Sequence, residues 1–412
     1  MKTITVSILG FGQRGLVYAE AIEKHTEEVK LVKVCEVNEK KHVSIMNRFH
    51  LSKDDIMLDE ETFFEQKWSD ILVISTMDKD HYRQVMKALD LGYDILLEKP
   101  IALNKEEIIQ IKDKANLLGR KIAVAHVLRY TMFYTKLKEL IDQRAIGEIV
   151  TLHQTENVGY FHYVHSYVRG NWHNSKDSSP MILAKSCHDL DIMRYLIGHR
   201  VKHMSSFGNL FYFKKENAPK GAKTHCKDCT VDCPFNALDF YRKNPRWMKI
   251  FSTDDDVDRV FQDETLNYGK CVYQMDNDVV DHQVVNLLFE HGATASLTMT
   301  GFSNENHRTI TIHGTMGEIN GDMDDYVITI KPYGKPIYHI DLREFTTDFS
   351  HHGGGDYRLF MDFIEAVRDD KYFITDINDS VESHVLALDA ETSRLKDGQV
   401  IDLTSSWSSY SR

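Results

Sequence analysis

The chain has 412 residues, 42% of them hydrophobic and 27% charged, which suits two or three folded domains and excludes disorder over any large part. Its formal net charge is -12 and no run of Lys and Arg stands out, which argues against nucleic acid or an anionic membrane surface as a partner. No apolar run approaches the roughly 20 residues of a membrane span, and the apolar N-terminal stretch is too short for a secretion signal.

In the first 125 residues, short runs rich in Val and Ile alternate with helical patterns. The strand-like runs cover residues 3–9, 30–35, 71–75, 94–97 and 122–125, and the helical patterns cover residues 16–24, 81–91 and 105–118. Buried parallel strands have this composition. Because strands that alternate with helices build a doubly wound parallel sheet, we expect an α/β domain over residues 1–125.

A glycine turn joins the first strand to the first helix. Its sequence is Gly10-Phe11-Gly12-Gln13-Arg14-Gly15. Such a turn lets the backbone approach a pyrophosphate at the N-terminus of the helix, as in Rossmann domains. Glu36 ends the second strand, where a carboxylate accepts hydrogen bonds from ribose hydroxyls. The sequence therefore predicts NAD as the cofactor, with NADP less favoured and Arg14 able to soften that preference.

The fourth strand ends at Glu98-Lys99-Pro100. Ligands of such sheets bind outside the carboxyl ends of the strands. An ammonium group at Lys99 is therefore expected beside the nicotinamide, where it would stabilise a developing alkoxide. A surface lysine at a strand end is an equally good interpretation from position alone.

A second domain is expected over residues 126–403. Strand patterns at residues 147–152, 279–289, 293–300, 309–314 and 326–331, and helices at residues 131–143, 355–368 and 380–395, predict an α+β domain with a mostly antiparallel sheet. Residues 214 to about 270 are charged and lack apolar periodicity, which indicates an insertion. The Ser-rich residues 404–412 are expected to form a tail.

Residues 160–174 are crowded with aromatic and hydrogen-bonding side chains. Carbohydrate sites use flat rings against C–H faces and polar groups for hydroxyls. Tyr163 and Trp172 are therefore expected to stack on a sugar, and His165, Arg169 and Asn171 to bind its hydroxyls. An aromatic loop packed against the sheet is the alternative.

An apolar, helical stretch over residues 181–197 contains Lys185, His188 and Asp191, spaced three apart so that neighbours share a face. A histidine there could take a hydroxyl proton as hydride leaves the same carbon. Asp191 could orient its imidazole. A structural histidine is the alternative.

Four of the six cysteines lie in or next to the insertion. Cys226, Cys229 and Cys233 are closely spaced and Cys271 follows, a pattern that suits a tetrahedral structural zinc ion. An iron–sulfur cluster or reduced thiols are the alternatives. Six cysteines are too few for a disulfide framework, and we expect a cytoplasmic protein.

Taken together, these motifs resemble those of the Gfo/Idh/MocA family, named for glucose–fructose oxidoreductase and inositol dehydrogenase. The resemblance covers nearly the whole chain. It rests on the glycine turn, the Glu-Lys-Pro tripeptide, Ser75-Thr76 with His81, His126 with Arg129-Tyr130, Gly147-Glu148-Ile149, and His188-Asp189-Leu190-Asp191.

The resemblance implies a Rossmann domain plus a second domain with a large open sheet, through which homodimers or homotetramers form. It implies an NAD(P)-dependent oxidoreductase that moves hydride between nicotinamide and a ring hydroxyl of a sugar, sugar derivative or polyol. Lys99 and His188 are the implied catalytic residues. The implied cofactor contacts add Ser75, Thr76, His81, Glu98 and Arg129 to the glycine turn and Glu36.

One departure concerns the charge beside His188. Many family members carry an aspartate four residues before this histidine, where this chain has Ala184. Lys185 is expected to take over as a catalytic residue and to bring a second ammonium group. An NAD-dependent glycosidase, which oxidises, eliminates, hydrates and reduces with tightly bound NAD, is therefore the alternative function, with His165 or Tyr163 as general acid. A non-catalytic NAD sensor would not need both Lys99 and His188.

Overall fold

The computed structural model describes residues 3–404. Two compact units divide the chain. Unit 1 consists of Met1–Arg144, Leu190–Gly198 and Ile340–Leu388, and unit 2 of Ala145–Asp189, His199–His339 and Asp389–Arg412. Unit 1 is larger than the predicted N-terminal segment because helices from the C-terminal part of the chain pack within it. Most of the predicted tail, residues 405–412, lies outside the described residues.

Unit 1 is built on a six-stranded parallel sheet of order β3-β2-β1-β4-β5-β6. The strands are β1 Ile4–Leu9, β2 Val29–Cys35, β3 Ile56–Met57, β4 Ile71–Ile74, β5 Asp94–Leu97 and β6 Ile122–Val124. Every residue of β4 is buried, as expected for a central strand with helices on both faces. The predicted doubly wound sheet is confirmed.

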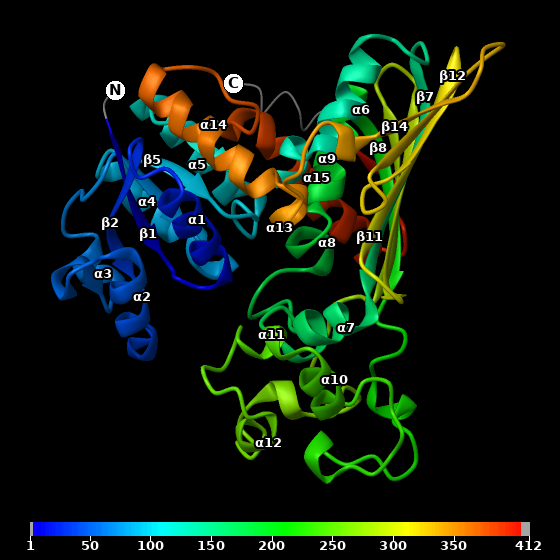
Figure 1. Cartoon of the computed structure of the whole chain (residues 1–412). Helices are drawn as coiled ribbons and strands as arrows, with labels where there is room; N and C mark the ends of the chain where they lie inside the picture. The colour runs from blue at the N-terminus through cyan, green and yellow to red at the C-terminus, as the bar shows by residue number, and fades with distance from the viewer. Residues whose placement is uncertain (1–2, 405–412) are drawn as a thin grey trace. The chain divides into compact units, whose positions relative to one another are not determined.

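Several helices of unit 1 precede, connect or follow these strands along the chain (Figure 1). They are α1 Gln13–Glu23, α2 His42–Phe49, α3 Glu60–Phe63, α4 His81–Asp90, α5 Lys105–Leu118 and α6 Met132–Asp142, with α13 Ser350–Gly353 and α14 Gly355–Asp369 from the C-terminal part. Helix α1 packs against α14, and α4 packs against α5. Phe360 and Phe363 of α14 lie in the same buried cluster as Val6 and Ile8 of β1.

Unit 2 contains a nine-stranded sheet of order β14-β13-β12-β11-β7-β10-β9-β8-β15. The strands are β7 Ile149–Gly159, β8 Val201–Asn209, β9 His282–Phe289, β10 Thr294–Ser303, β11 His307–Gly314, β12 Gly317–Asp322, β13 Val327–Pro332, β14 Tyr338–Asp341 and β15 Ile401–Asp402. β7 and β10 pair in parallel, whereas β9, β11, β12 and β15 pair antiparallel with their neighbours. The predicted mostly antiparallel sheet is confirmed.

Two stretches between the strands contain the candidate site residues. The first has α7 Tyr160–Tyr163, a π-helical segment Val164–Arg169, α8 Met181–Ala184 and α9 Cys187–Ile197. The second joins β8 to β9 and has only short helices, α10 Ala237–Lys243, α11 Pro245–Met248 and α12 Val257–Val260 (Figure 1). The long helix α15 Ile377–Leu395 precedes β15. No helix among residues 3–404 combines the length and apolarity that crossing a bilayer requires.

Candidate active site

The glycine turn has the geometry of a dinucleotide-binding loop. Gly10 has a φ of +87°, and a Cβ there would lie 2.8 Å from the Ser75 carbonyl oxygen. A Cβ on Gly15 would lie 2.4 Å from the Gly10 carbonyl oxygen. At Gly12, by contrast, a Cβ would meet no described atom within 4 Å. No described side chain caps α1, so its first N–H groups and the space beside Gly12 fit a bound pyrophosphate.

Glu36 lies directly after β2 and is 6% exposed. Its carboxylate accepts a hydrogen bond from the Asn38 backbone N–H at 2.9 Å and pairs with the Lys41 ammonium at 3.2 Å. Lys41 also donates to the Phe11 carbonyl oxygen at 3.2 Å. The predicted ribose-binding carboxylate therefore has a cation beside it that sequence analysis missed.

Arg14 lies inside an ion-pair network, and its expected contact with the cofactor stays a prediction. Its Nε donates to Glu98 at 2.6 Å, and one Nη donates to the buried carboxylate of Asp356. Tyr18 also donates to Glu98, at 2.6 Å. Despite burial, Arg14 and His352 lower the pKa of Asp356. Glu98 and Arg14 therefore hold helix α1 and the end of β5 together.

Side-chain hydrogen bonds hold the turns that follow β4 and β5. Ser75 Oγ donates to the Gly10 carbonyl at 2.7 Å, and Thr76 Oγ1 donates to the Gln84 side-chain oxygen. Buried His81 has Nδ1 2.6 Å from the Pro100 carbonyl, so Nδ1 carries the proton and donates. His81 thus helps to position the turn that contains Lys99. This turn follows β5, which ends at Leu97.

Lys99 lies near two buried histidines, His126 and His384. Burial, Arg129 and Lys99 lower the pKa of His126, and burial together with His126 lowers the pKa of His384 to about 3. The Lys99 ammonium therefore has neutral imidazoles as neighbours at physiological pH.

Arg129 and Asp191 form a buried, bidentate ion pair within unit 1. The two N–H···O distances are 2.8 and 2.6 Å. Arg129 also donates to the carbonyl oxygens of Ile374 and Asp379. The two residues therefore have a structural role, while the expected cofactor contact of Arg129 and the expected orientation of His188 by Asp191 stay predictions.

Unit 2 contains a cluster of buried charges on β7, β11 and the start of α9. Lys185 Nζ lies 3.3 Å from Glu156. Arg308 Nε lies 2.5 Å from Glu156 and 3.0 Å from Asp189, and Gln154 donates to Asp189 at 2.7 Å. Burial, opposed by Arg308, raises the pKa of Asp189 to about 6. The expected second cation, Lys185, is present but is paired with a carboxylate.

His188 is 5% exposed and lies in the first turn of α9, next to Asp189. A second histidine, His162 of α7, faces the same charges. Burial and Lys185 lower the pKa of His162 to about 3, and its Nδ1 lies 2.9 Å from Asn306. A neutral imidazole, an ammonium group and a side-chain amide thus occur together in unit 2, as the binding of hydroxyl groups requires.

The aromatic stretch is mostly part of the core rather than a stacking surface. Tyr163 is fully buried, and its hydroxyl donates to the Val280 carbonyl at 3.1 Å. His165 lies 2.8 Å from the Tyr241 hydroxyl, and buried Arg169 donates to the carbonyl oxygens of Lys270 and Phe235. Only Asn171 is exposed, and Trp172 is half-buried. Tyr163, His165 and Arg169 therefore support the structure of unit 2, and their expected contact with a sugar stays a prediction.

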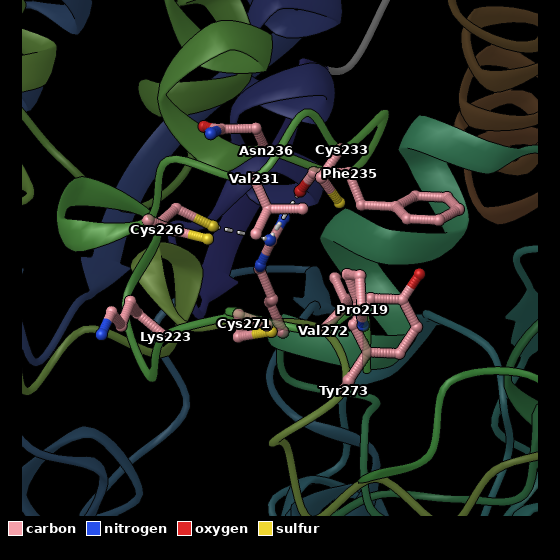
Figure 2. A pocket seen from close by; sticks show the side chains of 13 residues that line it. Pro219, Lys223, Cys226, Val231, Cys233, Phe235, Asn236, Cys271, Val272 and Tyr273 are labelled. Carbon is pink, nitrogen blue, oxygen red and sulfur yellow. Dashed lines mark hydrogen bonds between the residues drawn. The ribbon is translucent and has the colours of Figure 1, made fainter. Parts of the chain in front are cut away.

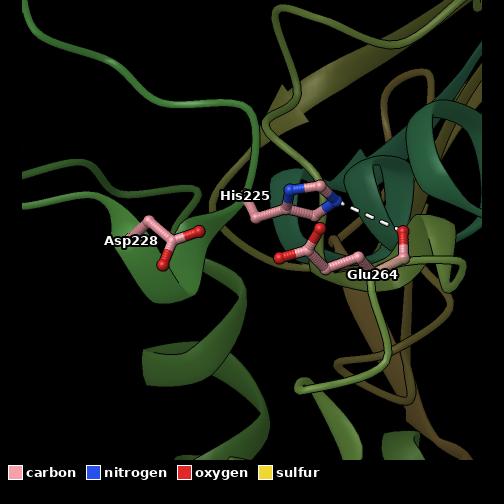
Figure 3. Close-up of side chains that lie close together, drawn as sticks. All are labelled: His225, Asp228 and Glu264. Carbon is pink, nitrogen blue, oxygen red and sulfur yellow. Dashed lines mark hydrogen bonds between the residues drawn. The ribbon is translucent and has the colours of Figure 1, made fainter.

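Cys226, Cys229, Cys233 and Cys271 all line one pocket, called the four-cysteine pocket from here on. Figure 2 shows Cys226, Cys233 and Cys271 around it. All four are free thiols. A different group, His225, Asp228 and Glu264, has ligand atoms within 4.8 Å of one another (Figure 3). Lys227 pairs with both of these carboxylates, at 3.3 and 2.9 Å, and thus already offsets part of their negative charge.

Two family models match the chain, one for each domain. Residues 4–126 match the Gfo/Idh/MocA oxidoreductase family, NAD-binding Rossmann fold, and residues 138–403 match the C-terminal alpha/beta domain of this oxidoreductase family. The chain belongs to the Gfo/Idh/MocA oxidoreductase family. The expected family and its Rossmann domain are confirmed.

Curated relatives of the Gfo/Idh/MocA chain include an oxidoreductase of Formosa agariphila, 28% identical over 37% of this chain and 49% of the relative. Another is the inositol 2-dehydrogenase/D-chiro-inositol 3-dehydrogenase of Lactiplantibacillus plantarum, 25% identical over 47% of this chain and 52% of the relative. The chain thus spans about half the length of these curated relatives.

Solved structures share the fold over nearly the whole chain. A levoglucosan dehydrogenase in complex with NADH and levoglucosan has a TM-score of 0.75 and 17% identity, covering 98% of this chain and 100% of that one. The WlbA dehydrogenase of Bordetella pertussis, in complex with NADH and UDP-GlcNAcA, has a TM-score of 0.72 and 18% identity, covering 98% of each chain.

Proposed function

We propose that this chain is an NAD-dependent oxidoreductase that transfers hydride between the nicotinamide and a ring hydroxyl of a sugar, sugar derivative or polyol. The proposal rests on the match of the chain to both domains of the family. The chain also has Lys99 directly after β5 and His188 at the start of α9. The inositol dehydrogenases among its relatives and the sugar-bound dehydrogenases of the same fold support the substrate class.

In this proposal, the turn at Gly10–Gly15 holds the pyrophosphate and Glu36 accepts from the adenosine ribose. The open space beside Gly12 and the N–H groups of α1 support this assignment. Bound NAD supplies the hydride acceptor. The carboxylate of Glu36 favours NAD over NADP, although Lys41 beside it reduces the repulsion of a 2′-phosphate.

His188 is the proposed general base, which takes the hydroxyl proton, and Lys99 stabilises the oxygen that loses it. Lys185 is proposed to hold a neighbouring hydroxyl while it stays paired with Glu156. His162 and Asn306 are added to the proposed substrate contacts because they face the same cluster. Asn171 and Trp172 remain proposed contacts because part of each side chain is accessible.

The NAD-dependent glycosidase is the second candidate. It needs a general acid for the leaving group, and His165 and Tyr163 were the expected residues. His165 is bonded to Tyr241, and burial raises the pKa of Tyr163 well above its usual value. These contacts favour the dehydrogenase.

We further propose that the protein works in the cytoplasm as a homodimer or homotetramer. Its free thiols suit a reducing compartment. Phe207 and Val284, which pair across β8 and β9, are 52% and 37% exposed, which supports burial of this sheet face in an assembly. The zinc ion predicted for the four cysteines has no part in the proposed reaction.

The test is a panel of free inositols, sugars and nitrophenyl glycosides with added NAD, with NADH absorbance and nitrophenol release followed together. Steady NADH accumulation without nitrophenol is the expected result. Nitrophenol release without net NADH would assign the glycosidase instead. NAD binding without turnover of any member would favour a sensor.

A further inference from the structure

The four-cysteine pocket brings together two segments that are far apart in the sequence. His225 and Lys270 form an isolated antiparallel bridge, and the Cys271 backbone N–H donates to the Thr224 carbonyl at 2.8 Å. Cys226 and Cys271 therefore follow directly after paired residues. Cys229 and Cys233 reach the same pocket from the loop after Cys226.

Three of the four sulfurs already accept hydrogen bonds from N–H groups. Cys226 Sγ lies 3.5 Å from Arg169 Nη2. Cys233 accepts from the backbone N–H of Phe235, and Cys271 accepts from that of Tyr273. In the last two cases the donor is two residues after the cysteine. A thiol is only a weak acceptor, whereas such donors stabilise metal-bound thiolates.

The remaining lining of the pocket selects for a soft ion. No carboxylate or imidazole lines it; its other residues are Arg169, Pro219, Ala222, Lys223, Val231, Phe235, Asn236, Val272 and Tyr273. Hard cations such as magnesium and calcium require oxygen ligands, which this set supplies poorly. Four thiolates suit zinc. The buried guanidinium of Arg169 would offset part of the negative charge of a zinc ion with four thiolates.

Around Cys226, the surrounding segment has little regular structure and only a small core of its own. Between β8 and β9, its α-helices have seven residues or fewer. Its local core is a small cluster that includes Cys226, Tyr241, Met248 and Phe261. Small cores of this kind commonly need a metal or a disulfide for stability.

We propose that Cys226, Cys229, Cys233 and Cys271 bind one zinc ion as four thiolates and that this ion fixes the segment between β8 and β9. The four thiols lose their protons to the buffer as the metal binds. No three of the four sulfurs, all of them in the described part of the chain, lie within 4.8 Å of one another. Zn–S bonds of about 2.3 Å therefore require the sulfurs to close in, which rotation about χ1 allows. This inference is independent of the proposed oxidoreductase activity.

The experiment uses the full chain purified under reducing conditions without added chelator, and metal content is measured by elemental mass spectrometry. The expected result is about one zinc ion per chain. Cys233→Ser should lose it, whereas Cys35→Ala, which removes a buried thiol of β2 in unit 1, should retain it. NAD binding by each variant reports whether unit 1 is folded.

Cobalt substitution provides a second readout that does not depend on activity. The chelator-treated chain, given Co²⁺, should develop the visible absorption of a tetrahedral tetrathiolate site, and Zn²⁺ should displace it. Arg169→Lys, which alters the donor to Cys226, should weaken zinc binding by about 10- to 100-fold.

Three results would overturn the proposal. The first is a chain that remains metal-free after incubation with Zn²⁺ and reductant. The second is bound iron with acid-labile sulfide. The third is a disulfide among these four cysteines in the chain isolated from cells with its thiols blocked during lysis.

Discussion

At the scale of single residues, the glycines of the turn Gly10–Gly15 meet two different requirements, although they belong to one sequence motif. Gly15 is needed because its neighbours leave no space for a side chain, while Gly12 borders open space. The first demand belongs to folding, and the second to the proposed binding of the cofactor. Sequence analysis treats the two glycines as one signature, and only the surrounding atoms distinguish them.

Substitutions with alanine should separate these demands. Gly15→Ala should lower the unfolding temperature, because its Cβ would lie 2.4 Å from the Gly10 carbonyl oxygen. Gly12→Ala should leave the unfolding temperature nearly unchanged but weaken NAD binding by about tenfold or more, because the methyl group occupies the proposed pyrophosphate position. Calorimetry of unfolding and of NAD binding checks both. Equal NAD affinity of Gly12→Ala and the natural chain would contradict the assignment.

At the scale of helices and strands, Arg308 of β11 connects β7 to the start of α9. It pairs with Glu156 and Asp189, which are 2% and 0% exposed. Removing one partner of a buried ion pair leaves an uncompensated charge, which costs about 3–5 kcal/mol. The start of α9, which includes His188, therefore depends on Arg308 for its position.

Arg308→Met should destabilise unit 2 by about 3–5 kcal/mol and raise the pKa of Asp189 above its value of about 6, because the nearest cation is lost. Arg259→Met is the control, since its partner Asp254 is at the surface and Arg259 is 67% exposed; exposed pairs contribute about 0–1 kcal/mol. Urea unfolding of both variants makes the comparison. A similar, small loss of unfolding free energy in both variants would contradict the role of Arg308 in connecting β7 to α9.

Much of this element-level structure can be read from the sequence. Strand β4 is an unbroken apolar run, β5 is apolar after Asp94, and polar residues mark the turn after each strand. Two of the features that escaped prediction have a clear physical reason. Residues 164–169 form a π-helical turn, whose period differs from 3.6, so the aromatic stretch showed no helical pattern. β3 has only two residues, too few for any pattern.

The partners of charged residues could not be predicted from the sequence. Arg129 and Asp191, or Arg14 and Asp356, are paired only because the chain folds back. Sequence analysis therefore assigned Arg129 and Arg14 to the cofactor. Gln154 and Glu156 did carry a signal, since they are polar residues at alternate positions on the buried face of β7.

At the scale of the whole molecule, both units contain neutral buried histidines. Burial is the main cause of the lowered pKa values, about 3 for His384 in unit 1 and about 4 for His165 in unit 2. The unfolded value is about 6.5. The unfolded chain therefore binds protons that the folded chain excludes, so the stabilisation is complete above pH about 6.5 and is lost as the pH falls.

The free energy of unfolding of both units should thus decrease as the pH is lowered from about 6.5 to 4. Most carboxylates titrate below this range. His384→Gln should flatten this dependence for unit 1, whereas His50→Gln, at an exposed histidine, should not. Urea titrations at several pH values provide the measurement. A constant free energy over this range would show that these histidines are protonated in the folded state.

The account depends most on His188 as the residue that takes the hydroxyl proton. The decisive measurement is the rate of NADH formation by His188→Ala on the first substrate that the panel identifies, with NAD affinity measured on the same sample. The predicted result is a rate lower by about 10²- to 10⁴-fold with NAD affinity nearly unchanged. A near-normal rate would contradict the proposed mechanism.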